Sequence, residues 1–272
     1  MLFLYSLEQN DFSERLKIMG GVFMKKILII SLVMMLLVAG CANNNIDSTD
    51  KLPETSEVLV GTIVDISSTS ILLATEAIGL VTLNTNHKIY SSEMKLVDTS
   101  ILKVGNEIEV GYSGVVLESY PQQLPEVDYV KQILSDTNYL PLFFQVIDDL
   151  YQTDEGLNSD IGYVAVDTSN LTMLGEWEKE GLVYALGTKY ALTGIQGTFE
   201  ELVDQGYIDG DALYFEEGIL FRFDIKATTA KTVKFDIEKW RGGLGAYFFI
   251  DCEAEQDQDG VWQYKIGSEA IS

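Results

Sequence analysis

Residues 102–112 read LKVGNEIEVGY, a strand enclosed by turn residues. Ile108 and Val110 alternate with glutamates, which predicts a β-strand with one apolar face and one wet face. Turn residues stand on both sides of this strand, at Gly105-Asn106 and Ser113-Gly114. Upstream, β-branched runs between Ser/Thr or Gly turns predict further strands, at Val58–Ile66, Ile71–Ala74 and Gly79–Leu83. About five strands in residues 58–120 predict a small closed or nearly closed all-β barrel, which removes exposed strand edges.

The same stretch, continued by Glu118-Ser119-Tyr120-Pro121, resembles the end of a small OB-like β-barrel domain found in lipoproteins of Gram-positive bacteria. The similarity covers residues 56–125, under a third of the chain. The resemblance implies an envelope lipoprotein with a barrel fold. It assigns no activity and gives no residue a catalytic role.

Pro121 and Pro125 interrupt the strand pattern and predict a linker over residues 121–137. In residues 138–272, three helices are expected. The first begins at Pro141, and the second covers Leu174–Leu186 and ends before Gly187. The third begins at the capping box Thr198-Phe199-Glu200-Glu201. Strands are expected at Ile161–Val166, Ala212–Ile225, Thr232–Ile237, Ala246–Cys252 and Val261–Ile266. This pattern predicts an α+β domain of about three helices packed on an antiparallel sheet.

An export signal precedes both regions. Met24-Lys25-Lys26 is followed by the apolar stretch Ile27–Leu37 and by Val38-Ala39-Gly40-Cys41. A basic start, an apolar core shorter than the about 20 residues of a membrane span, and small residues before a cleavage point are typical of a secretory signal peptide. The alternative, a plain transmembrane or buried helix, fits this length and these flanks less well.

The cysteine after small residues resembles the lipobox of bacterial lipoproteins. This resemblance implies that residues 24–40 are a lipoprotein signal peptide, cleaved between Gly40 and Cys41. It also implies diacylglyceryl transfer to the Cys41 sulfur and a lipid anchor at the extracytoplasmic face of the cell membrane. Residues 41–57 are polar after the cysteine, as expected of a solvated tether.

Residues 1–23 precede a complete signal peptide. Gly20-Gly21 can be encoded by a ribosome-binding sequence shortly before the Met24 codon. We therefore expect Met24 to be the true start and residues 1–23 to be a translated leader. An extended basic region of the signal is the alternative.

The chain of 272 residues holds 18 basic and 42 acidic side chains, a formal charge of −24 at pH 7. Such acidity argues against nucleic-acid binding, which depends on lysine and arginine at phosphates. Residues 41–272 hold 14 of the basic and 39 of the acidic side chains, so the acidity belongs to the exported part. We expect an anionic membrane surface to repel this part and keep it projecting outward.

Lys239-Trp240-Arg241 is the one basic spot in the acidic C-terminal region. With the glycines that follow, at Gly242, Gly243 and Gly245, it predicts a possible ligand contact where a ligand approaches the backbone closely. A packing turn explains the same residues without a ligand. The stretch 239–249, the segment 156–160 (GLNSD) and the terminal Ile271-Ser272 are similar to uncharacterised clostridial-type envelope proteins, a resemblance that names no activity.

Little of the sequence points to metal or nucleophile chemistry. His87 is the single histidine and is interpreted as a polar turn residue, since nothing near it suggests an oriented nucleophile. Cys252, the thiol left once Cys41 is lipidated, lies between Asp251 and Glu253, whose charges disfavour a thiolate. We interpret Cys252 as a buried apolar side chain, and we expect no cofactor.

The segment 255–260 (EQDQDG) imitates the start of a calcium loop, with Glu255, Asp257 and Asp259 at the ligand positions. The twelfth position is Ile266, where a bidentate glutamate would be needed. Asp259-Gly260 between two strands is also a hairpin signal. The hairpin is the preferred interpretation and calcium binding is the alternative.

Three acidic pairs are interpreted as solvated charge, because sequence neighbours do not supply the separation of glycosidase carboxylates: Asp148-Asp149, Glu200-Glu201 and Glu216-Glu217. The three tryptophans Trp177, Trp240 and Trp262 are interpreted as core residues rather than as a sugar-binding platform.

Together these observations predict an acidic, membrane-anchored lipoprotein of the cell envelope with a non-catalytic binding or interaction role. Its expected partners are the membrane, through the diacylglyceryl group at Cys41, and an envelope protein or small ligand. Two alternatives stay open. One is a hydrolase that acts on envelope glycans or peptides with carboxylates, and the other is a calcium-stabilised sensor domain.

Overall fold

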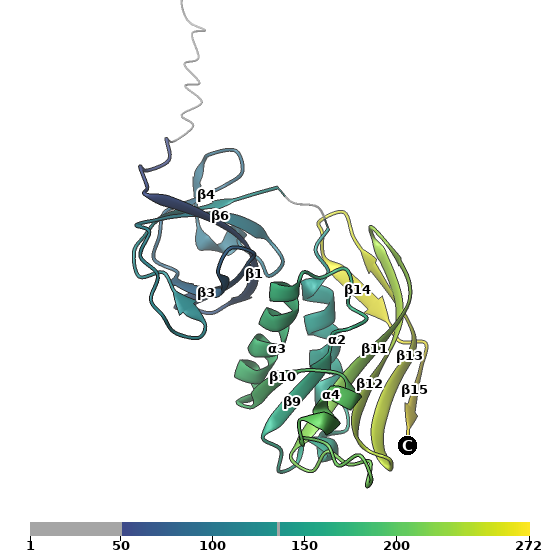
Figure 1. Cartoon of the computed structure of the whole chain (residues 1–272). Coiled ribbons are helices and arrows are strands. Elements are labelled where there is room, and N and C mark those ends of the chain that lie inside the picture. The colour runs from purple at the N-terminus through teal and green to yellow at the C-terminus, as the bar shows by residue number, and fades with distance from the viewer. Residues whose placement is uncertain (1–50, 135–136) are drawn as a thin grey trace, which may run out of the picture. The chain divides into compact units, whose positions relative to one another are not determined.

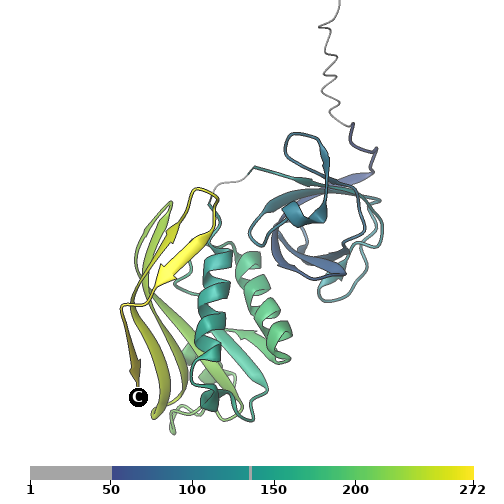
Figure 2. The ribbon, with the colours of Figure 1, turned by 180° about the vertical axis from the view of Figure 1, so that it is seen from behind.

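The computed structural model describes residues 51–134 and 137–272, and Figures 1 and 2 show their elements from two sides. The segments expected to be a leader, a signal peptide and most of a tether, with Cys41, lie outside the described residues. Two sheets account for most of the described part, one built from residues 57–132 and one from residues 163–271.

The first sheet contains eight strands in the described residues: β1 (Glu57–Ile66), β2 (Ser70–Thr75), β3 (Gly79–Asn84), β4 (Ile89–Tyr90), β5 (Leu96–Val97), β6 (Glu107–Tyr112), β7 (Gln122–Gln123) and β8 (Val127–Gln132). A 3-10 turn, η1 (Thr99–Ile101), precedes β6. The alternation at Ile108 and Val110 holds, since both side chains are completely buried in β6. Their cluster also includes Ile63, Leu73 and Val130 from neighbouring strands.

The expected closed barrel is wrong. The strand order is β5-β4-β8-β6-β1-β2-β3-β7, and in the described residues no pairing joins the two end strands β5 and β7. Both end strands are only two residues long, and β7 pairs with β3 through Val81 and Thr82 alone. Short edge strands present few unpaired backbone groups, so the sheet limits its exposed edges without closing.

The segment 121–137, expected to be a linker, contributes strands β7 and β8. Strand β8 lies between β4 and β6, and Tyr129 and Val130 are buried there. The prolines that suggested a linker stand outside β8, so they do not interrupt its hydrogen bonds. The first sheet therefore continues past residue 120.

The second sheet is mixed, which corrects the expectation of an antiparallel sheet. Its strands are β9 (Tyr163–Asp167), β10 (Thr193–Gln196), β11 (Gly218–Thr229), β12 (Thr232–Gly242), β13 (Gly245–Gln256), β14 (Trp262–Lys265) and β15 (Ser268–Ile271). The order is β10-β9-β11-β12-β13-β14, with β15 also paired to β13. Strands β10 and β11 both run parallel to β9, because helices connect these three strands, whereas hairpins connect β11 to β14.

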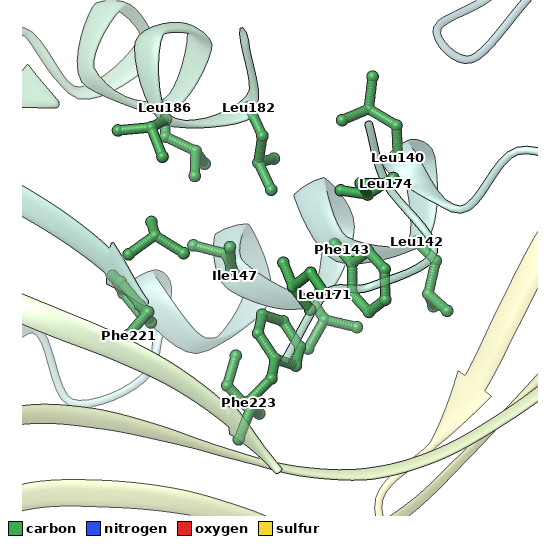
Figure 3. Close-up of a cluster of buried hydrophobic side chains, with 14 of the residues drawn as sticks. Leu140, Leu142, Phe143, Ile147, Leu171, Leu174, Leu182, Leu186, Phe221 and Phe223 are labelled. Carbon is green, nitrogen blue, oxygen red and sulfur yellow. The ribbon is translucent and has the colours of Figure 1, made fainter. Parts of the chain in front are cut away.

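Helices α2 (Leu140–Gln152) and α3 (Glu176–Tyr190) cover one face of this sheet (Figure 1). The stripe expected on α2 is buried as a set, at Phe143, Val146, Ile147 and Leu150. Figure 3 shows Phe143 and Ile147 directed toward Phe221 and Phe223 of β11, with leucines of α3 beside them. The Phe143 and Phe223 rings meet edge to face, with centroids 5.1 Å apart.

Helix α3 runs four residues past Leu186, the end expected from Gly187. Gly187 lies where a Cβ would be 2.7 Å from the backbone nitrogen of Gly194, so it allows β10 to return against the helix. Gly181 likewise allows Val64 to approach, since a Cβ there would be 2.7 Å from that side chain. The helix ends at Ala191, whose φ is 56°. The glycines of α3 therefore serve close packing rather than termination.

The opposite face of the sheet is partly covered by α4 (Phe199–Asp204) and the loop that follows it. Helix α4 begins with the expected capping box. The Glu201 backbone N–H donates to the Thr198 hydroxyl at 3.2 Å, and the Thr198 N–H donates to the Glu201 carboxylate at 2.8 Å. Among residues 51–134 and 137–272, no helix has the length and apolar character needed to cross a membrane.

Candidate functional site

Lys239 is completely buried on β12, on the sheet face that α2 covers. Its Nζ donates to the backbone carbonyls of Tyr151, Thr153 and Asp154, at 3.0, 2.8 and 3.1 Å. The first two carbonyls lie at the C-terminal end and cap of α2, where backbone acceptors lack helical partners and the helix dipole is negative, and Asp154 follows directly. Lys239 therefore holds the end of α2 against the sheet.

Burial lowers the pKa of Lys239 to about 8, against the smaller opposing effects of the Asp154 and Glu155 charges. The amine is still mainly protonated at neutral pH, so it donates all three hydrogen bonds there. Its Nζ also lies 5.6 Å from the centroid of the Tyr151 ring, within cation–π range. Tyr151 in turn stacks on Tyr190, with ring centroids 3.6 Å apart.

Arg241 holds two loops at the end of the same strand. Its guanidinium donates to the carbonyls of Leu157 at 3.1 Å, Ser159 at 2.7 Å and Glu216 at 2.8 Å. Leu157 belongs to the 3-10 turn η2 (Glu155–Asn158), and Glu216 precedes β11. The loop after α2 and the loop before β11 are thus fixed to one side chain.

Trp240 points to the other side of β12 and is 7% exposed. It packs with residues of the α4 face, and its ring meets that of Phe199 edge to face with centroids 5.3 Å apart. Lys239 and Trp240 are therefore unavailable to a ligand. Ligand contact by Arg241, which borders a cleft, stays a prediction.

The cleft beside Arg241 has a volume of about 680 Å³. Three segments surround it: residues 154–160, residues 204–217 and residues 241–245. We call their exposed side the three-loop surface, which lies at the lower end of the second sheet in Figure 1. The cleft lining combines apolar, glycine and polar residues: Gly156, Leu157, Ser159, Asp160, Ala212, Leu213, Tyr214, Arg241, Gly242, Gly243, Leu244 and Gly245.

Backbone hydrogen bonds join two of these loops. The Phe215 N–H donates to the Arg241 carbonyl at 2.8 Å, and the Gly243 N–H donates to the Leu213 carbonyl at 3.2 Å. A Cβ on Gly242 would be 2.8 Å from the Tyr214 ring, and one on Gly245 would be 3.3 Å from Leu157. The glycines that suggested close approach of a ligand therefore accommodate neighbouring side chains of the same chain.

The three-loop surface exposes large apolar side chains. Leu244, at the tip of the β12–β13 hairpin, is 96% exposed, Leu213 is 50% exposed and Tyr214 is 43% exposed. Leu213 also has a φ of 51°, a left-handed conformation that costs free energy for a non-glycine residue. Leu244 in particular buries almost none of its side chain, so it contributes little to the stability of the folded chain, and a group of exposed apolar side chains is typical of an interaction site.

The candidate calcium segment forms the preferred hairpin. Strands β13 and β14 pair on either side of it, and Gly260 has a φ of 77°. The Asp257 carboxylate accepts hydrogen bonds from the backbone N–H groups of Asp259 and Val261, both at 2.9 Å. Within the described part of the chain, no three His, Cys, Asp or Glu side chains gather as a metal site would require. Glu255, Asp257 and Asp259 are thus not brought together as a ligand set.

Cys252 is completely buried in β13, which confirms its interpretation as a core side chain. Burial, with the charges of Asp236 and Asp251, raises the pKa of its thiol to about 12. The Cys252 thiol is therefore protonated at neutral pH, where it is a poor nucleophile.

His87 lies half-buried in a bend, and burial lowers its pKa.

The acidic pairs have separate surroundings. Asp148 accepts hydrogen bonds from Lys189 at 2.8 Å and Tyr190 at 2.9 Å, and Asp149 accepts one from Tyr264 at 2.7 Å. Glu201 belongs to the capping box described above. Glu216 and Glu217 are exposed. Asp148 and Asp149 are thus less solvated than expected, because tyrosines of α3 and β14 donate hydrogen bonds to them.

The remaining tryptophans support the core interpretation. Trp262 is 4% exposed and donates from Nε1 to the Asn138 carbonyl at 2.8 Å. Trp177 is half-buried, and a Cβ on Gly79 would lie 2.9 Å from its ring. An open platform of aromatic rings is therefore not formed by these two residues.

Sequence reasoning missed Leu213, Tyr214 and Leu244. The sequence pattern predicts a strand from Ala212 on, in which Leu213 and Tyr214 would be ordinary sheet residues, but β11 begins at Gly218. Leu244 stands among glycines, which by themselves predict a turn. A usable signal was present, since a leucine between glycines at the turn of a hairpin has nowhere to bury its side chain.

No protein-family model matches this chain, and no curated protein matches it. Among solved structures, the YobA protein of Bacillus subtilis is similar over 30% of this chain and 99% of that protein's chain. The two are 18% identical over the matched part, and the TM-score is 0.23. At that TM-score the likeness supports no conclusion about fold or function, so the site is interpreted from its own residues.

Proposed function

We propose that this chain is an extracytoplasmic lipoprotein, anchored through lipid at Cys41, that binds a partner protein with its three-loop surface. The observation that carries the binding role is the pair of exposed leucines, Leu244 and Leu213, beside a cleft of about 680 Å³. The anchor rests on the lipobox-like residues Val38-Ala39-Gly40-Cys41 and the polar tether that follows them.

The rigidity of the three-loop surface supports binding. Lys239 and Arg241 together donate six hydrogen bonds to backbone carbonyls, of which five come from residues 151–159. A surface that is already ordered loses little conformational entropy when a partner binds. The buried Lys239 and the half-buried Arg241 thus pre-organise the loops that present Leu213 and Leu244.

The composition of the surface favours a protein partner over a small molecule. Tyrosine and arginine, with tryptophan, are enriched among the residues that contribute most to binding at protein interfaces. Tyr214 and Arg241 occur here together, with the guanidinium carbon 5.9 Å from the centroid of the tyrosine ring. Leu244 projects from a hairpin tip rather than lining the floor of an enclosed cavity, which suits insertion into a partner.

The described chemistry gives less support to a hydrolase. The pKa of the Glu93 and Glu253 carboxyls is lowered by neighbouring lysines, and that of Asp98 is lowered by hydrogen bonds from Ser100. A general acid needs the opposite shift. The thiol of Cys252 is buried with a raised pKa, so it does not provide a nucleophile either.

Site-specific photocrosslinking in cells tests the proposal. A photoreactive amino acid replaces Leu244 in the full-length chain, and a matched chain carries it at Leu134, which is 82% exposed outside the three-loop surface. We expect a discrete crosslinked protein from position 244 and not from position 134. In a Cys41→Ala chain, we expect loss of the membrane fraction and of that crosslink. Equal products from both positions, or none from position 244, would overturn the binding role.

A further inference from the structure

We propose that the partner contacts the three-loop surface with a cationic segment, in which lysine or arginine residues flank a bulky apolar side chain. This inference rests on the proposed function and specifies the partner's chemistry. The apolar side chain would enter the cleft beside Leu213, Tyr214 and Leu244. The cationic side chains would contact the acidic rim around the cleft.

The rim of the three-loop surface is strongly acidic. Its three segments hold eight acidic side chains and a single basic one, Arg241. The acidic side chains are all exposed: Asp154, Glu155, Asp160, Asp204, Asp209, Asp211, Glu216 and Glu217. Since the guanidinium of Arg241 donates to three carbonyls of the protein, it is not directed at these carboxylates. The surface thus has an apolar centre and an acidic edge.

Some acidic residues elsewhere on the second sheet form salt bridges within the chain. Asp224 and Asp236 form salt bridges with Lys226, and Glu253 forms one with Lys234. Among the described residues, none of the eight rim carboxylates forms a salt bridge. These three strand carboxylates are neutralised within the chain, whereas the rim carboxylates leave their charge available to a partner.

The negative charge of the rim distinguishes between three kinds of partner for the three-loop surface. An anionic lipid surface would be repelled by the rim, although Leu244 by itself would suit insertion into lipid. A second copy of this chain would bring the same acidic rim against the first and would also be repelled. A cationic protein segment with a bulky apolar side chain complements both the apolar centre and the acidic edge. This is the usual arrangement of an apolar interface core with a polar rim.

Peptide binding to the full-length lipidated protein in detergent micelles tests this inference. The probe is a short fluorescent peptide of lysines around one central leucine. Two matched peptides carry glutamates in place of the lysines, or serine in place of the leucine. We expect measurable binding of the first peptide, measured by fluorescence anisotropy, and at least tenfold weaker binding of either other peptide.

Protein variants locate the binding. Because Leu244 is 96% exposed, Leu244→Ser should fold normally, with an unchanged melting temperature. We expect it to weaken binding of the lysine–leucine peptide about tenfold, as the burial of one leucine predicts, while the matched control Leu134→Ser leaves binding unchanged. Asp160→Asn with Asp211→Asn should weaken binding and reduce its salt dependence, whereas Asp128→Asn with Glu118→Gln should do neither.

Three results would overturn the inference. The first is failure of the lysine–leucine peptide to bind, or binding that Leu244→Ser does not weaken. The second is Leu244-dependent binding to phosphatidylglycerol vesicles in place of the peptide. The third is a concentration-dependent dimer, seen by light scattering, that Leu244→Ser abolishes. If position 244 still crosslinks a protein in cells while the peptide fails, the proposed function stands and the cationic specificity is wrong.

Discussion

The two hairpins that share strand β13 end in turns of opposite character. At one end of β13, the turn between Gly242 and Gly245 carries Leu244, which is almost fully exposed. At the other end, the turn after Gln256 consists of polar residues and Gly260. The same strand therefore leads to an apolar tip and to a polar tip.

The tips differ in what orders them. The polar tip is stabilised by its own side chains, since the Asp257 carboxylate accepts two backbone hydrogen bonds and the Gln256 amide donates to the Gly260 carbonyl at 3.0 Å. The apolar tip depends on its surroundings, through Tyr214 and the carbonyl of Leu213. Because neighbouring loops order the apolar tip, its exposed leucine is not needed to form the turn. This difference distinguishes a tip suited to binding from one that only connects two strands.

Removal of the Lys239 amine tests the support behind the apolar tip, and we expect it to have the largest effect. Lys239→Met keeps the length of the side chain but leaves three backbone carbonyls, at and just after the end of α2, without their lysine donor. Loss of these charged hydrogen bonds, partly offset by removal of a buried charge, should lower the free energy of unfolding by about 3 kcal/mol. Chemical denaturation monitored by circular dichroism measures this value.

Lys265→Met is the matched control, because Lys265 is exposed on β14. We expect its effect to stay within about 0.5 kcal/mol, as is usual for surface substitutions. If Lys239→Met were as stable as the control, the end of α2 would not depend on Lys239. The pre-organisation of the three-loop surface would then need another source.

The dependence on Lys239 shows what sequence could and could not predict. The basic spot was visible, because lysine and arginine stand together in an acidic region. Its use was not visible, since five of the six carbonyl acceptors lie more than 80 residues earlier in the chain. A lysine on one strand that donates to carbonyls at the end of a distant helix leaves no local sequence pattern. The sequence alone therefore allowed both a ligand contact and a packing role for Lys239.

Local patterns predicted elements better than their assembly. The apolar stripe of α2 and the capping box of α4 are set by neighbouring residues, and both are present. Barrel closure and strand direction depend on pairings between distant segments. Strands β5 and β7 are too short to leave a clear signal, and β10 is a four-residue strand that sequence periodicity did not indicate. The closed barrel and the antiparallel sheet were wrong for this reason.

The pH dependence of stability sharpens the assignment of Lys239. Burial lowers its pKa to about 8 from an ordinary 10.5, so between these values the unfolded chain holds a proton that the folded chain releases. The free energy of unfolding should therefore rise with pH in this window, by at most about 1.4 kcal/mol per pH unit, and be independent of this group below it. The measured quantity is the stability of the natural chain minus that of Lys239→Met from pH 7 to 9.5.

This difference isolates Lys239 from other groups that titrate nearby. The pKa of Cys252 is raised from 9 to about 12, so its thiol lowers stability as the pH rises above 9. Both proteins share that contribution, and it cancels in the difference. A difference that stays flat to pH 9.5 would mean that the folded chain retains the Lys239 proton and that its hydrogen bonds outweigh burial.

The polar tip should show the smallest change. Asp257→Ala removes the two hydrogen bonds to the Asp259 and Val261 N–H groups, which lie in an exposed turn where water can replace the carboxylate. We expect a loss of about 1 kcal/mol in the free energy of unfolding, and unchanged crosslinking from position 244. Asp259→Ala is the matched control, since Asp259 takes part in these hydrogen bonds through its backbone N–H, which alanine keeps.

Calcium provides the second measurement on this tip. Because the Asp257 carboxylate already accepts backbone hydrogen bonds and Ile266 takes the place of the closing glutamate, we expect the melting temperature to be the same with millimolar calcium and with chelator. A calcium-dependent rise in the natural chain that disappears in Asp257→Ala would reverse the comparison. The polar tip would then be the ligand-binding end of β13, and the exposed leucine at the other end would need a different explanation.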